Sequence, residues 1–139
     1  MSSFLSLRAA FGRGERRPIR ILGASGQLGY GIPTLALEEG RRRKPDVRGC
    51  DMGSTDIGPQ YLGSGSMAVS REGAKRDLRK VLKAARSLNI PLIVGSAGSA
   101  GAAPHLAQTV EILREIATEE NLSFKLATIS ADIKKETAL

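Results

Sequence analysis

The residues best suited to chemistry gather in one glycine-rich stretch, DMGSTDIGPQYLGSGS, at positions 51–66. It holds two carboxylates, Asp51 and Asp56, among glycine and hydroxyl residues. If burial pushes their pKa values apart, such a pair can supply a general acid and a general base. Aspartate also makes local side-chain-to-backbone bonds in turns, which is the structural alternative for Asp56. Because glycine lets a ligand approach the main chain closely, the stretch predicts a binding or catalytic site.

Two other glycine-rich stretches, at positions 23–31 and 95–103, share this character. The hydroxyl groups of Ser96 and Ser99 are expected to donate hydrogen bonds rather than attack a substrate, because the sequence places no base beside them. The ring of Tyr61 is expected to wedge its loop against the sheet, with donation of a phenolic proton as the alternative. The predicted ligand-contacting residues of the three stretches are Ser25, Gly26, Gly53, Ser54, Thr55, Tyr61, Ser64, Ser96, Gly98 and Ser99.

His105 is the single histidine, and it follows Pro104 at the start of a predicted helix. A neutral imidazole there could act as an acid or a base, because the positive end of a helix lowers its pKa. The alternative is a half-exposed histidine in the first helical turn that has no chemical role. The predicted catalytic set is therefore Asp51, Asp56 and His105.

The string GASGQLG at positions 23–29 has the glycine spacing of short-chain-type dinucleotide-binding domains. Asp51 stands about where an acidic residue would hold the adenosine ribose. This pattern keeps open an NAD(P)-binding oxidoreductase, and a tight turn that binds nothing is its structural alternative. A ribose-binding acid is not ordinarily followed by a second long glycine-rich stretch, so positions 51–66 argue against a nicotinamide cofactor.

Composition and charge narrow the classes of site and partner. One histidine and one cysteine, Cys50, give no metal-ligand spacing and no internal disulfide, so we expect no metal site and a reducing, cytoplasmic compartment. Cys50 is interpreted as a small buried hydrophobe. The net charge of +7 comes without a nucleic-acid motif and with only 4% aromatic residues, so we expect no nucleic-acid partner. No stretch approaches the ~20 apolar residues that span a bilayer.

Residues 1–18 are basic, contain several serines and have few acidic side chains. We predict that they form a flexible N-terminal segment. An organellar transit peptide is the alternative for a chain of eukaryotic origin.

Short apolar runs predict strands, and apolar residues at helical spacing predict helices. These elements position the residues described above. Because these elements alternate, residues 19–139 are expected to form an α/β domain, a Rossmann-like three-layer fold with a mostly parallel sheet. Loops that follow parallel strands emerge on one edge, so the three glycine-rich stretches should converge there on an anionic ligand. Strands are expected at 19–22, 47–50, 91–95 and 123–129, and helices at 32–43, from Ser70 onward, at 104–120 and from Ser130 or Asp132.

The second and third glycine-rich stretches resemble a known family. The strings DMGSTDIGPQYLGSG at positions 51–65 and LIVGSAGSAG at positions 92–101, followed by Pro104 and His105, look like the N-terminal region of the acyclic terpene utilisation (AtuA-type) family. The resemblance covers Ile19 to the C-terminus. Members of that family are much longer, so the resemblance, like the break after a fourth predicted strand, implies the incomplete N-terminal part of a larger domain.

The family is implicated in the breakdown of acyclic terpenes such as citronellol and geraniol through acyl-CoA intermediates. The resemblance thus implies an enzyme, or an N-terminal enzyme domain, that binds a carboxylate or acyl-CoA-type substrate. Acid–base chemistry of a lyase or hydrolase type is favoured over redox chemistry. A non-catalytic subunit or binding module remains the alternative from another class. Expected partners are an anionic small molecule and either the missing C-terminal region or another subunit, and a homo-oligomer is compatible with the sequence.

Overall fold

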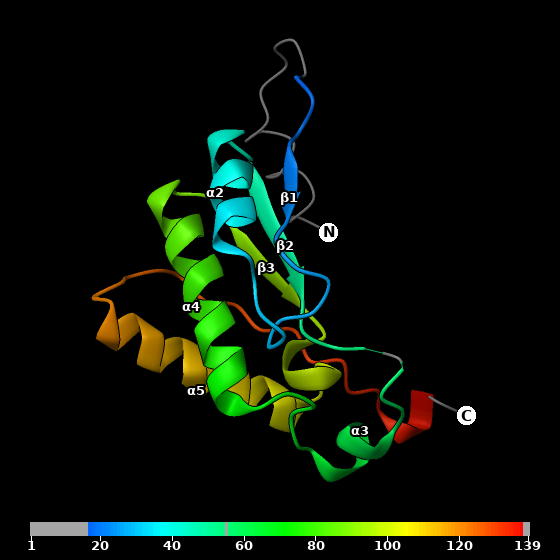
Figure 1. Ribbon diagram of the computed structural model, residues 1–139. Coiled ribbons are helices and arrows are strands. Elements are labelled where there is room, and N and C mark those ends of the chain that lie inside the picture. The colour runs from blue at the N-terminus through cyan, green and yellow to red at the C-terminus, as the bar shows by residue number, and fades with distance from the viewer. Residues whose placement is uncertain (1–16, 55, 138–139) are drawn as a thin grey trace.

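The computed structural model describes residues 17–54 and 56–137, which form the α/β arrangement of Figure 1. Three short strands make one parallel sheet in the order β1-β2-β3. The predicted α/β class with a parallel sheet is confirmed, and the described part corresponds to a portion of a Rossmann-like fold. The segment predicted for residues 1–18 lies almost wholly outside the described residues. The elements are β1 (Ile21–Gly23), α2 (Thr34–Arg42), β2 (Val47–Asp51), α3 (Gln60–Ser64), α4 (Arg71–Ser87), β3 (Leu92–Gly95), the 3-10 turn η1 (Ala97–Ser99), α5 (Ala103–Glu119) and the 3-10 turn η2 (Lys135–Thr137).

Two helical crossovers link the strands. The first, α2, leads from β1 to β2, and the second, α4, leads from β2 to β3. Both crossovers step across the sheet in the same direction, so a common hand places both helices on the same face. Figure 1 shows α2 and α4 beside each other on that face.

The hydrophobic core lies between this face of the sheet and the helices. Leu22 packs against α2 so closely that a Cβ at Gly40 would lie 2.8 Å from its side chain. Cys50 is buried in the same cluster as Leu78 of α4 and Ile112 of α5, as expected for a small hydrophobe. The other face of the sheet is uncovered by the described residues, and Ile21 and Ile93 are 73% and 61% exposed there.

The helix α4 packs across the sheet. Its first turn is capped by Ser70, whose hydroxyl accepts a hydrogen bond from the amide of Gly73 at 3.1 Å, as the sequence predicts. An apolar stripe along this helix is buried, with Leu78, Val81 and Leu82 at most 4% exposed. These contacts fix α4 across β2 and β3 and so hold the loops that surround its N-terminus.

The predicted fourth strand, at 123–129, is wrong. This segment has an extended backbone but forms no ladder with the described strands. Leu122 and Phe124 pack against the core, whereas Ile129 is 89% exposed. Alternating apolar residues require only an extended chain with one side toward the core, and they do not specify a hydrogen-bonded neighbour.

The helix expected from Ser130 or Asp132 is also wrong, since the chain forms only the turn η2 further on. Instead, the Asp132 carboxylate accepts the amide hydrogen of Ala103 at 2.8 Å and so caps the start of α5. The chain is held there by a second bond, from the Ala131 amide to the Gly101 carbonyl at 2.9 Å. Aspartate is a favoured capping residue, and here Asp132 caps a helix that starts 29 residues earlier in the chain.

No helix in the described ranges is both long enough and apolar enough to cross a membrane.

Candidate functional site

The three glycine-rich loops meet at the carboxyl edge of the sheet. The amide of Leu28, in the first loop, donates to the carbonyl of Asp51 at 2.8 Å, and the amide of Met52 donates to the carbonyl of Gly95 at 3.0 Å. Gly53 of the second loop packs directly against the third loop. A Cβ at this position would lie 2.1 Å from the Ser99 carbonyl oxygen and 2.6 Å from the Ser96 Cβ. Only glycine therefore fits at position 53 without moving the third loop.

The first loop is held by a carboxylate of α4 that was not predicted from the sequence. Asp77 of α4 is fully buried, and its Oδ2 accepts the amide hydrogens of Gly29 and Gly31, each at 2.8 Å. The Arg76 guanidinium donates to Oδ1 at 2.9 Å. Burial alone would raise the pKa of Asp77, but the hydrogen bonds from Arg76, Gly29 and Gly31 outweigh it, and the pKa lies below its usual value.

A signal for Asp77 was present in the sequence. Asp77, Val81 and Ala84 follow helical spacing, so this acid falls on the buried side of the α4 pattern. A charged residue at such a position requires partners, and glycine amides are suitable ones. The inner part of the loop is also satisfied locally, because the Ser25 hydroxyl accepts from the Gln27 amide and donates to the Gln27 carbonyl. Gly26, in contrast, is exposed, and a Cβ there would meet nothing within 4 Å.

The two candidate carboxylates of the second loop are both exposed. Oδ1 of Asp51 accepts the amide hydrogens of Met52 at 2.7 Å and Gly53 at 3.1 Å. The amide of Asp56 donates to the Ser54 hydroxyl at 3.3 Å, which is a local turn bond of the kind the structural alternative expects. The burial that the acid–base interpretation requires is therefore not provided by the described residues. Thr55 lies outside the described residues.

His105 is fully buried, not half-exposed. Its Nε2 lies 3.0 Å from the carbonyl oxygens of both Tyr61 and Ser66, so this nitrogen carries the proton and donates to the main chain within α3 and just after it. Its other ring nitrogen, Nδ1, is buried and has no hydrogen-bond partner among the described residues. The ring thus joins α3 to α5 through Nε2–H, while Nδ1, which carries the lone pair, is buried away from solvent.

The short helix α3 was not expected within the second loop. Pro59 precedes it, and Gly65 ends it with a φ of 69°, the left-handed conformation that suits a helix C-terminus. Proline before and glycine after a short run are a readable signal for one helical turn. The turn leaves Ser64 exposed, with its hydroxyl 2.6 Å from the hydroxyl of Ser66, and brings Tyr61 into contact with His105 through the main chain.

The third loop is shaped by backbone conformations that few residues adopt. Ser96 has a φ of 46° and its side chain is exposed at the edge. Gly98 has a φ of 74°, and a Cβ there would lie 2.8 Å from the His105 Cβ. Ser99 is buried, and its amide donates to the Ser96 carbonyl at 3.0 Å. A non-glycine residue in the left-handed region costs free energy, and such strain gathers at functional loops.

The structure therefore divides the predicted site into two groups. The exposed group at the edge is available to a ligand, and the buried group shapes the loops. Comparison with known proteins adds no further constraint, because no family model matches this chain and neither a curated protein nor a solved structure matches it significantly. The exposed group is Gly26, Asp51, Asp56, Ser64 and Ser96, and the buried group is Gly53, Gly98, Ser99 and His105, while Ser25, Ser54 and Tyr61 are half-buried and belong to neither group.

Proposed function

We propose that the carboxyl edge of the sheet binds an anionic small molecule, a carboxylate or an acyl-CoA-type ester. The observation that carries the proposal is the meeting of three glycine-rich loops at this edge, with Gly53 of the second loop packed directly on Ser96 and Ser99 of the third. Loops of this kind bring main-chain amides and hydroxyl groups to one place, which suits an anion. The long resemblance of positions 51–65 and 92–101 to the acyclic terpene utilisation family supports an enzyme of acyclic terpenoid catabolism, or its N-terminal domain.

In this proposal the exposed carboxylates carry the chemistry. Asp56 lies in the turn after Ser54, to whose hydroxyl its amide donates, and Asp51 ends β2 beside the third loop. Either can exchange a proton with a bound substrate, since both are open to it. His105 contributes by fixing α3 and the main chain around Tyr61, which forms the outer wall of the second loop.

The dinucleotide alternative is disfavoured by Asp77. In a dinucleotide-binding turn the amides after the glycines face the pyrophosphate at a helix N-terminus. Here the amides of Gly29 and Gly31 face the Asp77 carboxylate, and α2 begins only at Thr34. An internal carboxylate thus occupies the positions that a phosphate would need.

Thermal-shift measurements separate these possibilities, because a ligand that binds only the folded state raises the Tm. The probes are acyl-CoA esters of acyclic terpene acids, free CoA, simple carboxylates, NADH and NADPH. We expect a rise with the acyl-CoA esters or the carboxylates. A rise with NADPH alone would contradict the proposal. Gly26→Ala is a matched probe, because the added methyl meets no protein atom and should obstruct only a ligand on the first loop.

Turnover is a separate readout. Asp56→Asn should abolish consumption of the acyl-CoA ester while it leaves the Tm of the ligand-free protein unchanged, because the Asp56 side chain is exposed. Retained turnover would remove Asp56 from the mechanism. Asp46→Asn is not a suitable control, because Asp46 accepts the Arg20 amide hydrogen at 2.9 Å. Glu39→Gln on α2 is preferable, since Glu39 is exposed and, among the described residues, pairs only with the exposed side chains of Arg42 and Arg43.

A second candidate is a non-catalytic subunit or binding module. The exposed face of the sheet favours it, because Ile21 and Ile93 lie there without cover from the described residues. Size measurement of the purified chain, alone and with co-expressed partners, tests this. A stable complex together with no ligand-induced rise in Tm would favour the second candidate over the first.

A further inference from the structure

A groove separates β3 from the extended segment that follows α5. Figure 1 shows this segment, coloured orange to red, turning back after α5 and running toward the other end of that helix. The groove has a volume of about 680 Å³ and lies between β3, the end of α4, α5 and residues 123–128. Its side chains are mainly apolar, and Leu92, Val94, Leu106 and Val110 line it. Such a size falls within the range of small-molecule sites, roughly 300–1,000 Å³.

The outer edge of β3 opens onto this groove. Pro91 and Gly95 use their carbonyls to bind the amides of β2 residue Arg48 and of Met52. In a parallel ladder the alternate residues face away from that neighbour, so the main-chain groups of Leu92 and Val94 face outward. They make no other main-chain hydrogen bond among the described residues. The groove therefore exists because residues 123–129 run beside the outer edge of β3 without forming hydrogen bonds to it.

The charges around the groove are all of one sign. Arg86 and Lys125 line it, and Arg114 lines an adjoining hollow of about 590 Å³. No aspartate or glutamate lines either hollow. Arg86 and Lys125 belong to the end of the groove remote from the glycine-rich loops, because α4 ends there and the chain leaves α5 there.

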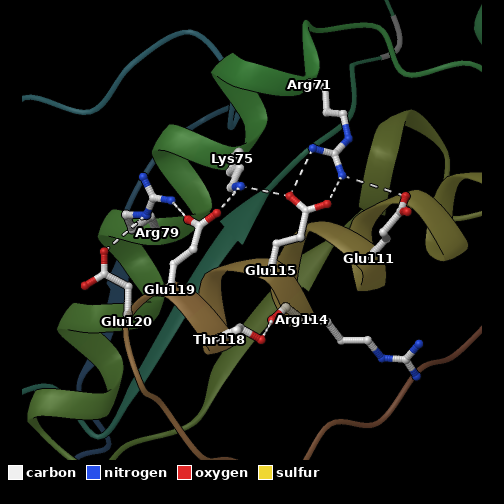
Figure 2. Close-up of polar contacts among 9 residues, drawn as sticks. All are labelled: Arg71, Lys75, Arg79, Glu111, Arg114, Glu115, Thr118, Glu119 and Glu120. Atoms are coloured by element: carbon white, nitrogen blue, oxygen red, sulfur yellow. Dashed lines mark hydrogen bonds and ion pairs between the residues drawn. The ribbon is translucent and has the colours of Figure 1, made fainter.

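On the opposite side of the α4–α5 pair, in contrast, the positive charges are compensated by ion pairs. Figure 2 shows Arg71, Lys75 and Arg79 of α4 turned toward glutamates of α5, while the side chain of Arg114 extends away from them. The pairs are Arg71 with Glu111 and Glu115, Lys75 with Glu115 and Glu119, Arg79 with Glu119 and Glu120, and Lys83 with Glu120. Arg86, Arg114 and Lys125 form no ion pair with the described residues, so the groove side carries uncompensated positive charge.

We propose that this groove binds an amphiphile, a single apolar chain with an anionic head group. The chain lies along Leu92, Val94, Leu106 and Val110, and the head group pairs with Arg86 and Lys125. Burial of the apolar chain removes its surface from water. The charged head group of the amphiphile then lies beside the cationic side chains and forms charge-assisted hydrogen bonds with them. Within the described part of the chain, the groove meets the glycine-rich edge only at Ala97 of η1, and its cations lie at the far end, so the proposal does not depend on the function proposed for that edge.

Titration calorimetry with decanoate, decanol and decylamine tests the proposal. The three probes share one chain length and differ only in the head group. We expect decanoate to bind most tightly, decanol more weakly and decylamine weakest. Arg86→Gln combined with Lys125→Gln should raise the Kd for decanoate about tenfold and leave that for decanol nearly unchanged. Arg42→Gln, an exposed cation on α2, is the matched control.

Val110→Phe tests the chain position, because the larger side chain enters the groove and should weaken decanoate and decanol alike. If the double variant does not fold, Lys125→Gln alone carries the test, since Lys125 is exposed and lies outside the helices. Equal affinity for decanoate and decylamine would overturn the assignment of the head group. Hydrogen-exchange protection of the Leu92 and Val94 amides in the ligand-free protein would overturn the site, because residues 123–129 would then close the groove as a strand. A dimer that buries Val110 would overturn it as well.

Discussion

The Asp77 carboxylate lies 2.8 Å from the Gly29 amide nitrogen, so an acid on α4 holds the turn at the end of β1. The same oxygen accepts the Gly31 amide hydrogen. Backbone amides in a glycine-rich turn attract an anion, and here the chain supplies that anion itself. The first loop is therefore a fixed support for the edge, while the second and third loops keep their exposed polar groups for a ligand.

Asp77→Ala should lower the free energy of unfolding by about 2 kcal/mol or more, because the half-buried amides of Gly29 and Gly31 both lose their acceptor. Urea denaturation at neutral pH measures the change. Glu72→Ala, an exposed acid on the same helix, is the control and should change stability by about 0.5 kcal/mol or less. An equal effect of the two substitutions would contradict the role of Asp77. The folded-state pKa of Asp77 is lowered, so its stabilising contribution is present above its unfolded pKa and is lost as the pH falls through the folded one.

The ion pairs between α4 and α5 predict a second loss of stability in acid. Hydrogen bonds from Arg71 and then Lys75 lower the pKa of Glu115 to about 2, from an ordinary value of 4.5. A depressed folded-state pKa means that the contribution is complete above about pH 4.5 and disappears as the pH falls toward 2. At low ionic strength, the Tm of the unsubstituted protein should fall more steeply in this pH window than the Tm of the Glu115→Gln variant. Added salt should reduce the difference between the two proteins, because these side chains are partly exposed.

Sequence patterns predicted the α/β class and the first three strands because these depend on local composition. Apolar runs that end in glycine-rich loops require a buried strand followed by a turn, and the Ser70 cap marks the start of α4. The pairing of residues 123–129 could not be predicted, because it depends on whether a neighbouring edge is within reach. The buried state of His105 was missed for a similar reason. Its partners are the main-chain carbonyls of Tyr61 and Ser66. Every residue carries such a carbonyl, so residue types do not show which ones bind a side chain.

Cys50 should be unreactive in the folded protein. Burial raises the pKa of its thiol to about 12, so the nucleophilic thiolate is scarce at neutral pH. We expect a disulfide-exchange reagent at about pH 8 to label Cys50 only when the protein unfolds, which makes the labelling rate a measure of opening. Fast labelling under native conditions, at the rate of a free thiol, would show that the core around β2 is open.

Arg48 should be replaceable by an apolar residue with a gain in stability. Its side chain is fully buried, and none of its guanidinium nitrogens has a hydrogen-bond partner among the described residues. Burial lowers the pKa of this group, which reflects the cost of a charge without a partner. Arg48→Met keeps the length of the side chain and should raise the free energy of unfolding by about 1 kcal/mol or more in urea denaturation. Arg42→Met, at an exposed site, should not raise the free energy of unfolding. A loss of stability in Arg48→Met alone would show that the guanidinium has a partner in solution.

His105→Ala should loosen α3 before it affects any other element. The substitution removes the N–H that bridges the carbonyls of Tyr61 and Ser66, and it opens space beside Gly98. We expect lower hydrogen-exchange protection at residues 60–66 and a free energy of unfolding reduced by about 2 kcal/mol. Gln108→Ala is a useful comparison, because Gln108 also binds this region through the Gly65 carbonyl at 2.8 Å but lies closer to the surface. If His105→Ala abolished acyl-CoA turnover while residues 60–66 kept full protection, the imidazole would act on the substrate and not through α3. Loss of both together, with partial recovery in His105→Gln, would place its contribution in positioning, because the glutamine amide can restore a donor to the same carbonyls.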